Sequence, residues 1–334
     1  MKRAGWLAAM AASLAVSLPA GARPAAPGCD RACLTGVVDA YLQAMVAHDP
    51  RRAPFARGAK FTENTSILPF SEGLWLTATA IDPYRILVLD PETAQAAYVG
   101  VVREHGREVL LAARIKAPGG RIAEVETVVA RDLAMMKNLR TPRAPIMAPL
   151  APGERVPRDR LIAAANAYFD GIEQSNGRII PFDKDCNRLK NGLQTTNNPD
   201  LMAELAAARA RQTGGSAPTP LPRVQASAPP RAPMPRDCEG QIDSGAMGFI
   251  SKVTPRRGYV VDEVTGTVFG LFMFVHRGDA TDIRLKDGST MPSPFGGQPW
   301  NMQMAELFKT RRGRIWLVEA IGTPLPFGAR TGWE

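Results

Sequence analysis

The sequence predicts an α+β protein built from two tandem cone-shaped domains, each a curved antiparallel sheet wrapped on helices. An amphipathic helix precedes four β-rich runs between residues 84 and 131, and the same order of elements returns in the second half. The 334 residues, of which 45% are hydrophobic and 22% charged, suffice for two domains of about 100–200 residues each. A sheet that bends around its helix leaves a conical hollow at its open end.

Residues 1–22 have the pattern of a secretory signal peptide. Lys2 and Arg3 precede an apolar run, and Ala20-Gly21-Ala22 is a small-residue cleavage site. The run is shorter than the ~20 residues of a membrane span, and no later stretch is apolar and long enough to be one. We therefore expect a secreted or periplasmic protein, cleaved near Ala22. A lipid anchor on Cys29 is disfavoured by Pro27, which stands where a lipobox has a small residue.

The formal net charge of +9 raises the question of an anionic partner. Much of the excess lies in the proline-rich segments 140–160 and 211–236, and no basic stripe is interleaved with aromatic residues. We therefore expect no nucleic-acid partner.

Four cysteines remain after export, and an even number in an oxidising compartment predicts two disulfides. The local pairing, Cys29 with Cys33 and Cys186 with Cys238, would pin the two ends of a proline-rich insertion. Metal binding is disfavoured, because there is no Cys-x-x-Cys and the three histidines are far apart. We expect no metal.

The first domain is expected over residues 29–136. Asp30 can cap a helix over 34–47, whose apolar residues recur at helical spacing until Pro50 ends it. Residues 51–60 are a connection or a short second helix, 61–68 a strand, and 71–79 a short helix or turn. The four runs 84–90, 95–104, 107–117 and 121–131 then form a hairpin meander, because turn residues separate them: Asp90-Pro91-Glu92, His105-Gly106 and Pro118-Gly119-Gly120.

A proline-rich linker over 137–157 separates this domain from a second one over 158–334. Asp159 can cap a helix over 160–174. Strands are expected over 178–189, 258–275, 302–310 and 314–321, and a helix over 199–211. A proline-rich insertion at about 197–236 has the composition of a low-complexity segment.

The second half reads as a copy of the first. Ala40-Tyr41-Leu42 matches Ala167-Tyr168-Phe169, Gly100 matches Gly270, and six residues over 116–126 match residues over 309–319 at one constant offset. The offset grows where the proline-rich insertion and a long hairpin loop occur. Glu126 and Glu319 fall at equivalent places, which indicates a structural role such as a cross-strand ion pair.

This order of elements resembles the nuclear transport factor 2-like fold, which includes SnoaL-like polyketide cyclases and scytalone dehydratase. A closer resemblance is to a group of secreted fungal and bacterial proteins built from two such units, with no assigned function. It is carried by the segments Cys29-Asp30-Arg31, Phe61-Thr62-Glu63-Asn64, Cys186-Asn187-Arg188-Leu189 and Tyr259-Val260-Val261-Asp262-Glu263-Val264. The resemblance implies export and two cone-shaped domains, and it implies no particular reaction.

The second half holds the first candidate site. Asp183, Asp185 and Arg188 lie on or beside one expected strand, and Tyr259, Asp262 and Glu263 lie on another. Alternation allows only one of the two adjacent acids to face the hollow, where burial would make it a general acid or base. The alternative interpretation is an Arg–carboxylate pair that holds two strands together.

The first half holds the second candidate site. Glu63 and Asn64 face the meander, with aromatic and basic residues as expected neighbours. Aromatic side chains with a few polar groups are typical of a small-molecule pocket, although an ordinary core is the alternative. The expected neighbours are Tyr41, Trp75, Tyr84, Arg85 and Tyr98.

Two functions are consistent with these residues. The first is an exported lyase, dehydratase or isomerase that needs no cofactor and uses Glu263, Asp262 or Glu63 for proton transfer on an aromatic or sugar-derived molecule. The alternative is a non-catalytic ligand-binding or assembly module. Motifs for serine hydrolases, nucleotide binding, dinucleotide binding and zinc proteases do not occur. Such units can pair as homodimers or, here, within one chain.

Overall fold

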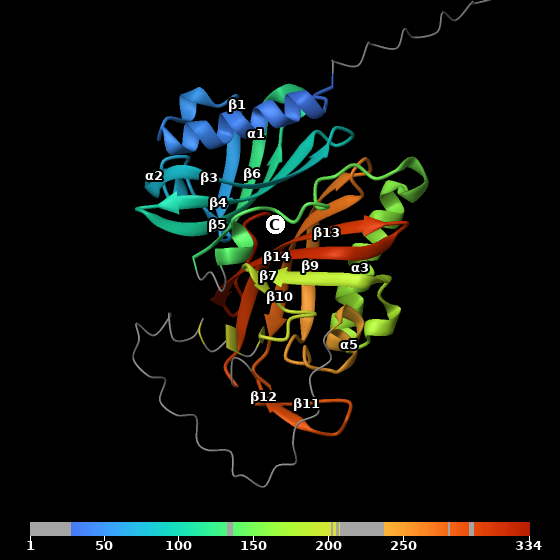
Figure 1. The fold of residues 1–334 in the computed structure, drawn as a ribbon. Coiled ribbons are helices and arrows are strands. Elements are labelled where there is room, and N and C mark those ends of the chain that lie inside the picture. The colour runs from blue at the N-terminus through green and yellow to red at the C-terminus, as the bar shows by residue number, and fades with distance from the viewer. Residues whose placement is uncertain are drawn as a thin grey trace, which may run out of the picture.

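A computed structural model describes residues 28–131, 136–201, 203–204, 207, 237–279, 281–293 and 297–334. The expected signal peptide and the segment 213–236 lie outside the described residues, as does most of the expected helix over 199–211. The described chain forms two α+β domains, each with a curved sheet of six strands (Figure 1). No helix in these ranges is long and apolar enough to cross a membrane.

The first domain contains a sheet in the strand order β2-β1-β6-β5-β4-β3. The meander has nearly the predicted bounds, and β4 has them fully. Its elements are α1 (Arg31–Val46), the 3₁₀ turn η1 (Pro50–Arg52), β1 (Phe55–Glu63), β2 (Ser66–Ile67), α2 (Leu74–Thr77), β3 (Ala78–Asp90), β4 (Gln95–Glu104), β5 (Arg107–Lys116), η2 (Pro118–Gly120) and β6 (Ile122–Ala130).

Two expectations for this sheet are wrong. The sheet is mixed rather than antiparallel, because β1 runs parallel to β6, the last strand of the meander. The strand β1 begins at Phe55, within the stretch expected to be a connection, because that stretch pairs with β6 from Ile122 onward. The tertiary pairing therefore overrides a segment that has little strand character of its own.

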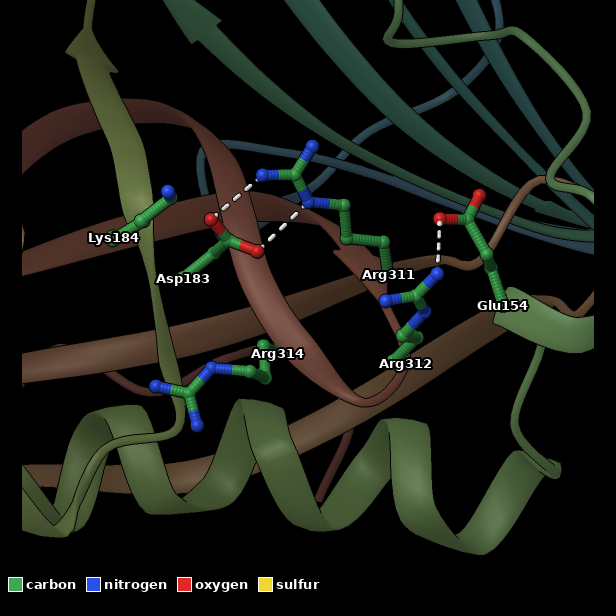
Figure 2. Close-up of a pocket in the computed structure, with 6 residues that line it drawn as sticks. All are labelled: Glu154, Asp183, Lys184, Arg311, Arg312 and Arg314. Atoms are coloured by element: carbon green, nitrogen blue, oxygen red, sulfur yellow. Dashed lines mark hydrogen bonds and ion pairs between the residues drawn. The ribbon is translucent and has the colours of Figure 1, made fainter.

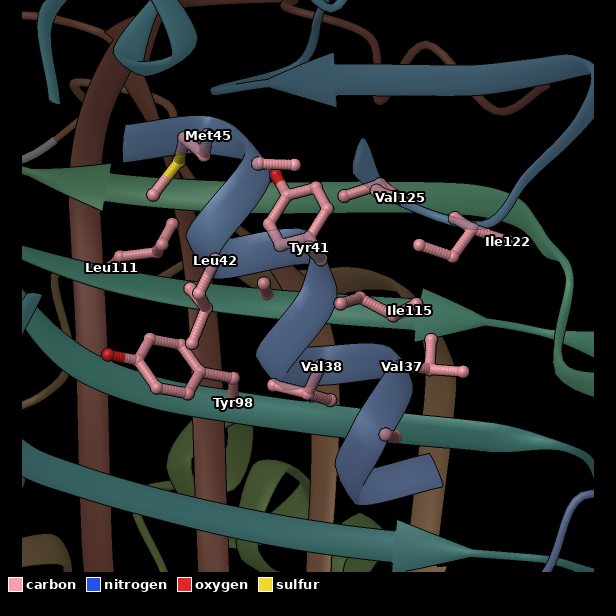
Figure 3. Close-up of a cluster of buried hydrophobic side chains, with 14 of the residues drawn as sticks. Val37, Val38, Tyr41, Leu42, Met45, Tyr98, Leu111, Ile115, Ile122 and Val125 are labelled. Carbon is pink, nitrogen blue, oxygen red and sulfur yellow. The ribbon is translucent and has the colours of Figure 1, made fainter. Parts of the chain in front are cut away.

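The helix α1 packs on one face of this sheet. The Asp30 side chain accepts a hydrogen bond from the backbone N of Cys33 at 2.8 Å and so caps the helix. Residues spaced three and four apart then place one apolar face on the strands (Figure 3). The core that results contains Leu34, Val37, Val38, Tyr41, Leu42, Met45, Tyr98, Leu111, Ile115, Ile122 and Val125.

The second domain repeats this arrangement in the strand order β8-β7-β14-β13-β10-β9, again with its first long strand parallel to its last. The expected strand over 258–275 is two strands, since the chain turns after Asp262. After the linker turns η3 (Met136–Leu139) and η4 (Pro152–Glu154), its elements are α3 (Arg158–Gln174), η5 (Gly177–Ile179), β7 (Phe182–Lys190), β8 (Leu193–Gln194), α5 (Cys238–Asp243), β9 (Lys252–Asp262), β10 (Thr267–His276), β11 (Asp282–Arg284), β12 (Thr290–Pro292), β13 (Trp300–Arg311) and β14 (Arg314–Pro326).

The strand registers support the internal repeat. Lys116 pairs with Glu124 in the first domain, and Lys309 pairs with Leu317 in the second. Both residues of the second pair lie at the constant sequence offset from their counterparts in the first. The glycine match is wrong by two residues, because Tyr98 pairs with Ala113 whereas Gly270 pairs with Glu306. The aromatic residue and the glycine have exchanged places along the strand: Tyr98 covers Gly100, and Phe272 covers Gly270.

The two sheets pack against each other, each with the face that its helix does not cover. A separate apolar cluster fills this junction and draws residues from both domains. From the first domain it takes Tyr84, Ile86, Val88, Val99, Val101 and Leu110, and from the second Val260, Phe269, Leu271, Leu307, Leu317 and Ile321. The chain thus pairs its two domains internally.

Two ion pairs across this junction are related by the repeat. Arg31 is the first residue of α1 and binds Asp262, the last residue of β9, at 2.7 Å. Arg158 is the first residue of α3 and binds Asp90, the last residue of β3, at 2.8 Å. A two-fold symmetric dimer makes every contact twice in this reciprocal way, so the chain is built as a pseudo-dimer.

The matched glutamates also serve the junction. The Glu126 side chain is fully buried and accepts hydrogen bonds from both terminal guanidinium nitrogens of Arg257, which belongs to the other domain. It also lies 3.9 Å from Arg114 on the neighbouring strand. Glu319 binds Arg143 of the linker at 2.8 Å. The shared structural role is therefore to anchor segments from outside their own sheets.

Candidate functional site

The interior of the second domain contains a cluster of polar side chains between α3 and the sheet, which we call the interior cluster: Tyr168, Arg188, Lys190 and Glu306. Arg188 donates to the Tyr168 hydroxyl at 2.6 Å and to the Gln241 side-chain oxygen. Glu306 lies close enough to Tyr168 for the two groups to shift each other's pKa, and Arg188 acts on the pKa of both. An apolar core surrounds the group, including Phe169, Phe182 and Phe308.

Glu306 is the carboxylate of the cluster. It lies on β13 and is 1% exposed, with its Oε2 atom lacking a hydrogen-bond partner. Burial raises the pKa of Glu306 to about 7, against the opposing effects of Arg188, Lys190 and Tyr168. A carboxyl group with such a pKa can both take and return a proton near neutral pH.

Lys190 connects the cluster to the edge of the domain. The residue is partly exposed, and burial of its amino group lowers its pKa to about 8, although Glu306 opposes that shift. Its Nζ lies 3.4 Å from the sulfur of Met302. The cluster thus combines a carboxyl group and an amine whose pKa values have moved toward each other.

The first domain offers a comparison at the same positions. The strand registers place Phe61 where the second domain has Arg188, Glu63 where it has Lys190, and Ala113 where it has Glu306. Its helix presents Tyr41 at the position of Tyr168, but Tyr41 accepts a hydrogen bond from the Trp75 indole instead. The first copy therefore has one buried carboxylate, Glu63, among aromatic residues, whereas the second has Arg188, Lys190 and Glu306.

The raised pKa of Glu306 predicts a pH-dependent stability difference between the wild type and Glu306→Gln. Between pH 4.5 and about 7 the folded wild type retains a proton that the unfolded chain releases, so its stability relative to the variant falls as the pH rises through this window. The span corresponds to about 3 kcal/mol. Urea denaturation of both proteins from pH 4.5 to 8 measures it, and a difference that stays flat would contradict the account.

The candidate residues of the second half do not gather around one hollow. They lie on β7 and β9, which are far apart in the strand order β8-β7-β14-β13-β10-β9. Asp183 forms a bidentate pair with Arg311 (Figure 2). Arg311 also binds Asp185 at 3.1 Å. Only Arg188 of this set belongs to the interior cluster.

At the end of β9 one acid serves the domain junction and the next one binds α3 of the same domain. Asp262 binds Arg31, and Glu263 accepts a hydrogen bond from the backbone N of Arg158 at 2.6 Å, at the start of α3. The hydroxyl of Tyr259 donates to Asn166 of α3 at 2.7 Å. These contacts hold the strand and the helix in place.

The candidates of the first half are likewise engaged in packing. Glu63 accepts a hydrogen bond from the backbone N of Leu74 at 2.7 Å, and burial raises its pKa. The Asn64 side chain bonds the backbone of Val129, while Tyr41 and Trp75 bond each other. Arg85 binds Asp39 at 2.6 Å. Tyr84 belongs to the junction cluster, so its side chain lies on the opposite face of the sheet from Tyr41.

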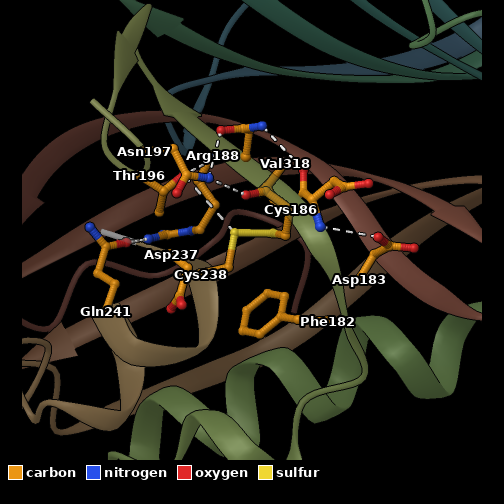
Figure 4. The surroundings of a disulfide bond; sticks show 12 residues. Phe182, Asp183, Cys186, Arg188, Thr196, Asn197, Asp237, Cys238, Gln241 and Val318 are labelled. Atoms are coloured by element: carbon orange, nitrogen blue, oxygen red, sulfur yellow. Dashed lines mark hydrogen bonds between the residues drawn. A yellow bond between two sulfur atoms is a disulfide. The ribbon is translucent and has the colours of Figure 1, made fainter. Parts of the chain in front are cut away.

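Both predicted disulfides are confirmed, Cys29–Cys33 and Cys186–Cys238. The second joins β7 to α5 beside the interior cluster, since Arg188 of the same strand binds Gln241 of the same helix (Figure 4). It therefore holds together two elements that supply the cluster. Sequence reasoning missed Glu306 and Lys190. The available signal was a difference between the two copies: the first domain has Ala113 at the position of Glu306, and the opposite charge of Glu63 at the position of Lys190.

Comparisons with known proteins bear on this architecture. The chain matches the family described as "Domain of unknown function (DUF8021)" over residues 28–129 and 154–322. No curated protein matches it significantly. Among solved structures it is similar to one titled "Crystal Structure of Putative Isomerase from Bacillus subtilis", with a TM-score of 0.24 and 11% identity, over 49% of this chain and 87% of that one.

Proposed function

This chain belongs to the family of the domain of unknown function DUF8021, and we propose that it is an exported protein that binds a small organic molecule at the interior cluster of its second domain and transfers a proton there. Glu306 is the base, and the reaction is an isomerisation, dehydration or related lyase step that needs no cofactor. The observation that carries the proposal is a buried carboxyl group with an unpartnered oxygen and a pKa near 7.

The proposed step begins with a C–H bond next to a carbonyl group of the substrate. The Glu306 carboxylate takes the proton, and the electron pair of that bond forms an enolate. The Tyr168 hydroxyl, which Arg188 polarises at 2.6 Å, and the Lys190 ammonium stabilise the enolate oxygen. Return of the proton from Glu306 to a different carbon completes an isomerisation. Its transfer instead to a β-hydroxyl group, which then leaves as water while the enolate electrons form the C=C bond, completes a dehydration.

Access to the cluster would come from the side of Lys190. Met302 and Met304 lie there, over Gly322, where a side chain would collide with both sulfur atoms. Methionine is unbranched and has several rotatable bonds, so these side chains can move aside for a guest more easily than branched residues can.

Export and the nuclear transport factor 2-like resemblance of the sequence also support the proposal. The disulfides suit an oxidising compartment, which agrees with a signal peptide over 1–22. The fold to which the sequence is similar includes cyclases and a dehydratase that act on small molecules in the hollow of such a unit. We expect an aromatic or sugar-derived carbonyl compound as the ligand.

Deuterium exchange tests the proposed chemistry without knowledge of the product. Compounds that raise the melting temperature of residues 23–334 in a screen of aromatic and sugar-derived carbonyl metabolites are incubated with the protein in D₂O. Wild type should replace the proton next to the carbonyl group by deuterium, seen by proton NMR. Glu306→Gln should slow this exchange by at least about 100-fold, the usual size of a general-base contribution.

Variants of the other carboxylates decide between bases. Glu63→Gln, Asp262→Asn and Glu263→Gln should keep most of the exchange activity. Loss of exchange in Glu63→Gln alone would move the site to the first domain, and full exchange in Glu306→Gln would end the assignment of Glu306.

A non-catalytic binding or assembly role is the second candidate function. The first domain favours it, because Phe61 stands at the position of Arg188 and stacks on Phe70, with ring centroids 5.0 Å apart. In this case compounds bind and raise the melting temperature, but no exchange occurs with any of them.

A further inference from the structure

An open pocket of about 460 Å³ lies where the linker meets the edge of the second sheet, apart from the interior cluster. The strand β7, the turn between β13 and β14, and the linker turn η4 contribute its lining, which is Glu154, Asp183, Lys184, Arg311, Arg312 and Arg314 (Figure 2). The volume is that of a small-molecule site. Four cations against two carboxylates make the lining basic.

One of the four cations, Arg311, is held by other side chains of the protein. Arg311 donates two hydrogen bonds to Asp183, and its guanidinium lies 4.3 Å from the centre of the Trp316 ring. The neighbouring Arg311 lowers the pKa of Asp183, so that carboxylate stays charged and is neutralised by its partner. This pair forms a fixed wall of the pocket.

The other three cations keep donors free. Lys184 is exposed and makes no ion pair with any described residue. Arg312 has a side chain 73% exposed and reaches Glu154 only at 3.6 Å. Arg314 is exposed and donates to the backbone oxygen of Phe182. Figure 2 places Lys184 and Arg314 on either side of Asp183, with Arg312 beside Glu154.

The first domain has part of this group of charges. Its Arg57 and Arg121 stand at the positions of Lys184 and Arg314, and Arg121 donates to the backbone oxygen of Phe55 at 2.8 Å, which matches the bond from Arg314 to Phe182 in the second domain. Before Arg121 the chain reads Pro118-Gly119-Gly120, however, whereas Arg311 and Arg312 stand at the first two of these positions in the second domain. These two arginines are therefore an addition to the repeat.

We propose that this pocket binds an organic polyanion that carries two or more carboxylate or phosphate groups. Guanidinium groups bind both kinds of oxyanion through paired hydrogen bonds, and Lys184 adds a point charge to the lining. The pocket is open, so it suits a soluble ligand or the end of a charged chain. This site is independent of the proposed reaction at Glu306.

Isothermal titration calorimetry of residues 23–334 with citrate and with pyrophosphate at low ionic strength tests the site. At least one probe should bind, and Lys184→Ala/Arg312→Ala should weaken its binding by at least about 10-fold. Lys184 makes no ion pair with any described residue, and Arg312 makes only an exposed one of 3.6 Å to Glu154, so the variant should fold. Arg121→Ala is a control for the loss of a positive charge outside this pocket, because it removes an exposed arginine of the first domain, and it should bind the probe as wild type does.

The two probes separate the carboxylate source from the phosphate source. Binding of citrate alone assigns a polycarboxylate, binding of pyrophosphate alone assigns a phosphate compound, and both should weaken as salt is raised to about 0.15 M. Absence of binding by both probes, or equal affinity in wild type and Lys184→Ala/Arg312→Ala, overturns the proposal. An equal loss in Arg121→Ala would also overturn it.

Discussion

Replacing Asp262 by alanine should lower the free energy of unfolding by about 3 kcal/mol. The Asp262 side chain is 1% exposed, binds Arg31 of the other domain at 2.7 Å and accepts hydrogen bonds from the backbone N atoms of Val264 and Thr265. Its removal leaves those donors without a partner. We expect the lower end of the range for broken buried pairs, because Arg31 is 39% exposed and can bind water. Urea denaturation measures the change.

The repeat supplies the matched control for this prediction. Asp90→Ala breaks the reciprocal pair with Arg158 and should destabilise the protein by a similar amount, since Asp90 is also 1% exposed in its side chain. In double-mutant cycles, Asp262 should couple with Arg31 and Asp90 with Arg158, whereas the crossed combinations should be additive. Asp262→Ala within about 0.5 kcal/mol of wild type would refute the pseudo-dimer junction as a source of stability.

Removing the Cys186–Cys238 disulfide should lower the stability by about 4 kcal/mol, and removing Cys29–Cys33 should lower it by about 2 kcal/mol. The difference follows from the chain lengths that the bonds close, with sequence separations of 52 and 4. A longer closed loop restricts the unfolded chain more. The double variants Cys186→Ser/Cys238→Ser and Cys29→Ser/Cys33→Ser, compared by urea denaturation, check both values.

The longer disulfide also has a local role that this pair of variants can reveal. It joins β7 to α5, and the same two elements supply Arg188 and Gln241. We therefore expect Cys186→Ser/Cys238→Ser to diminish ligand binding at the interior cluster even at temperatures where the variant stays folded. A larger loss of stability in the Cys29–Cys33 variant would contradict the loop-length explanation.

The fold was predictable from sequence where local signals dominate. The strands β4, β5 and β6 are bounded by turns at His105-Gly106 and Pro118-Gly119-Gly120, and turn chemistry is a short-range property. The start of β1 at Phe55 and its parallel pairing with β6 were not predictable, because they depend on a strand more than 60 residues away.

The candidate site was harder to predict for a related reason. Alternation along β9 separates Asp262 from Glu263, but it does not say which face of the strand meets the other domain, and that face proved to hold Asp262. In the sequence, Glu306 is a single acidic residue within an apolar run of β13. Only the folded sheet brings it near Arg188 and Lys190. Only Arg188 of the interior cluster was named from the sequence.

The central claim is that a carboxyl group inside the second domain titrates near neutral pH and serves as a base. Carbon-13 NMR of protein labelled at the glutamate carboxyl carbons tests it most directly, with the signal of Glu306 assigned by its absence in Glu306→Gln. We expect Glu306 to titrate with a midpoint at about pH 7. A midpoint near 4.5, the ordinary value for glutamate, would contradict it.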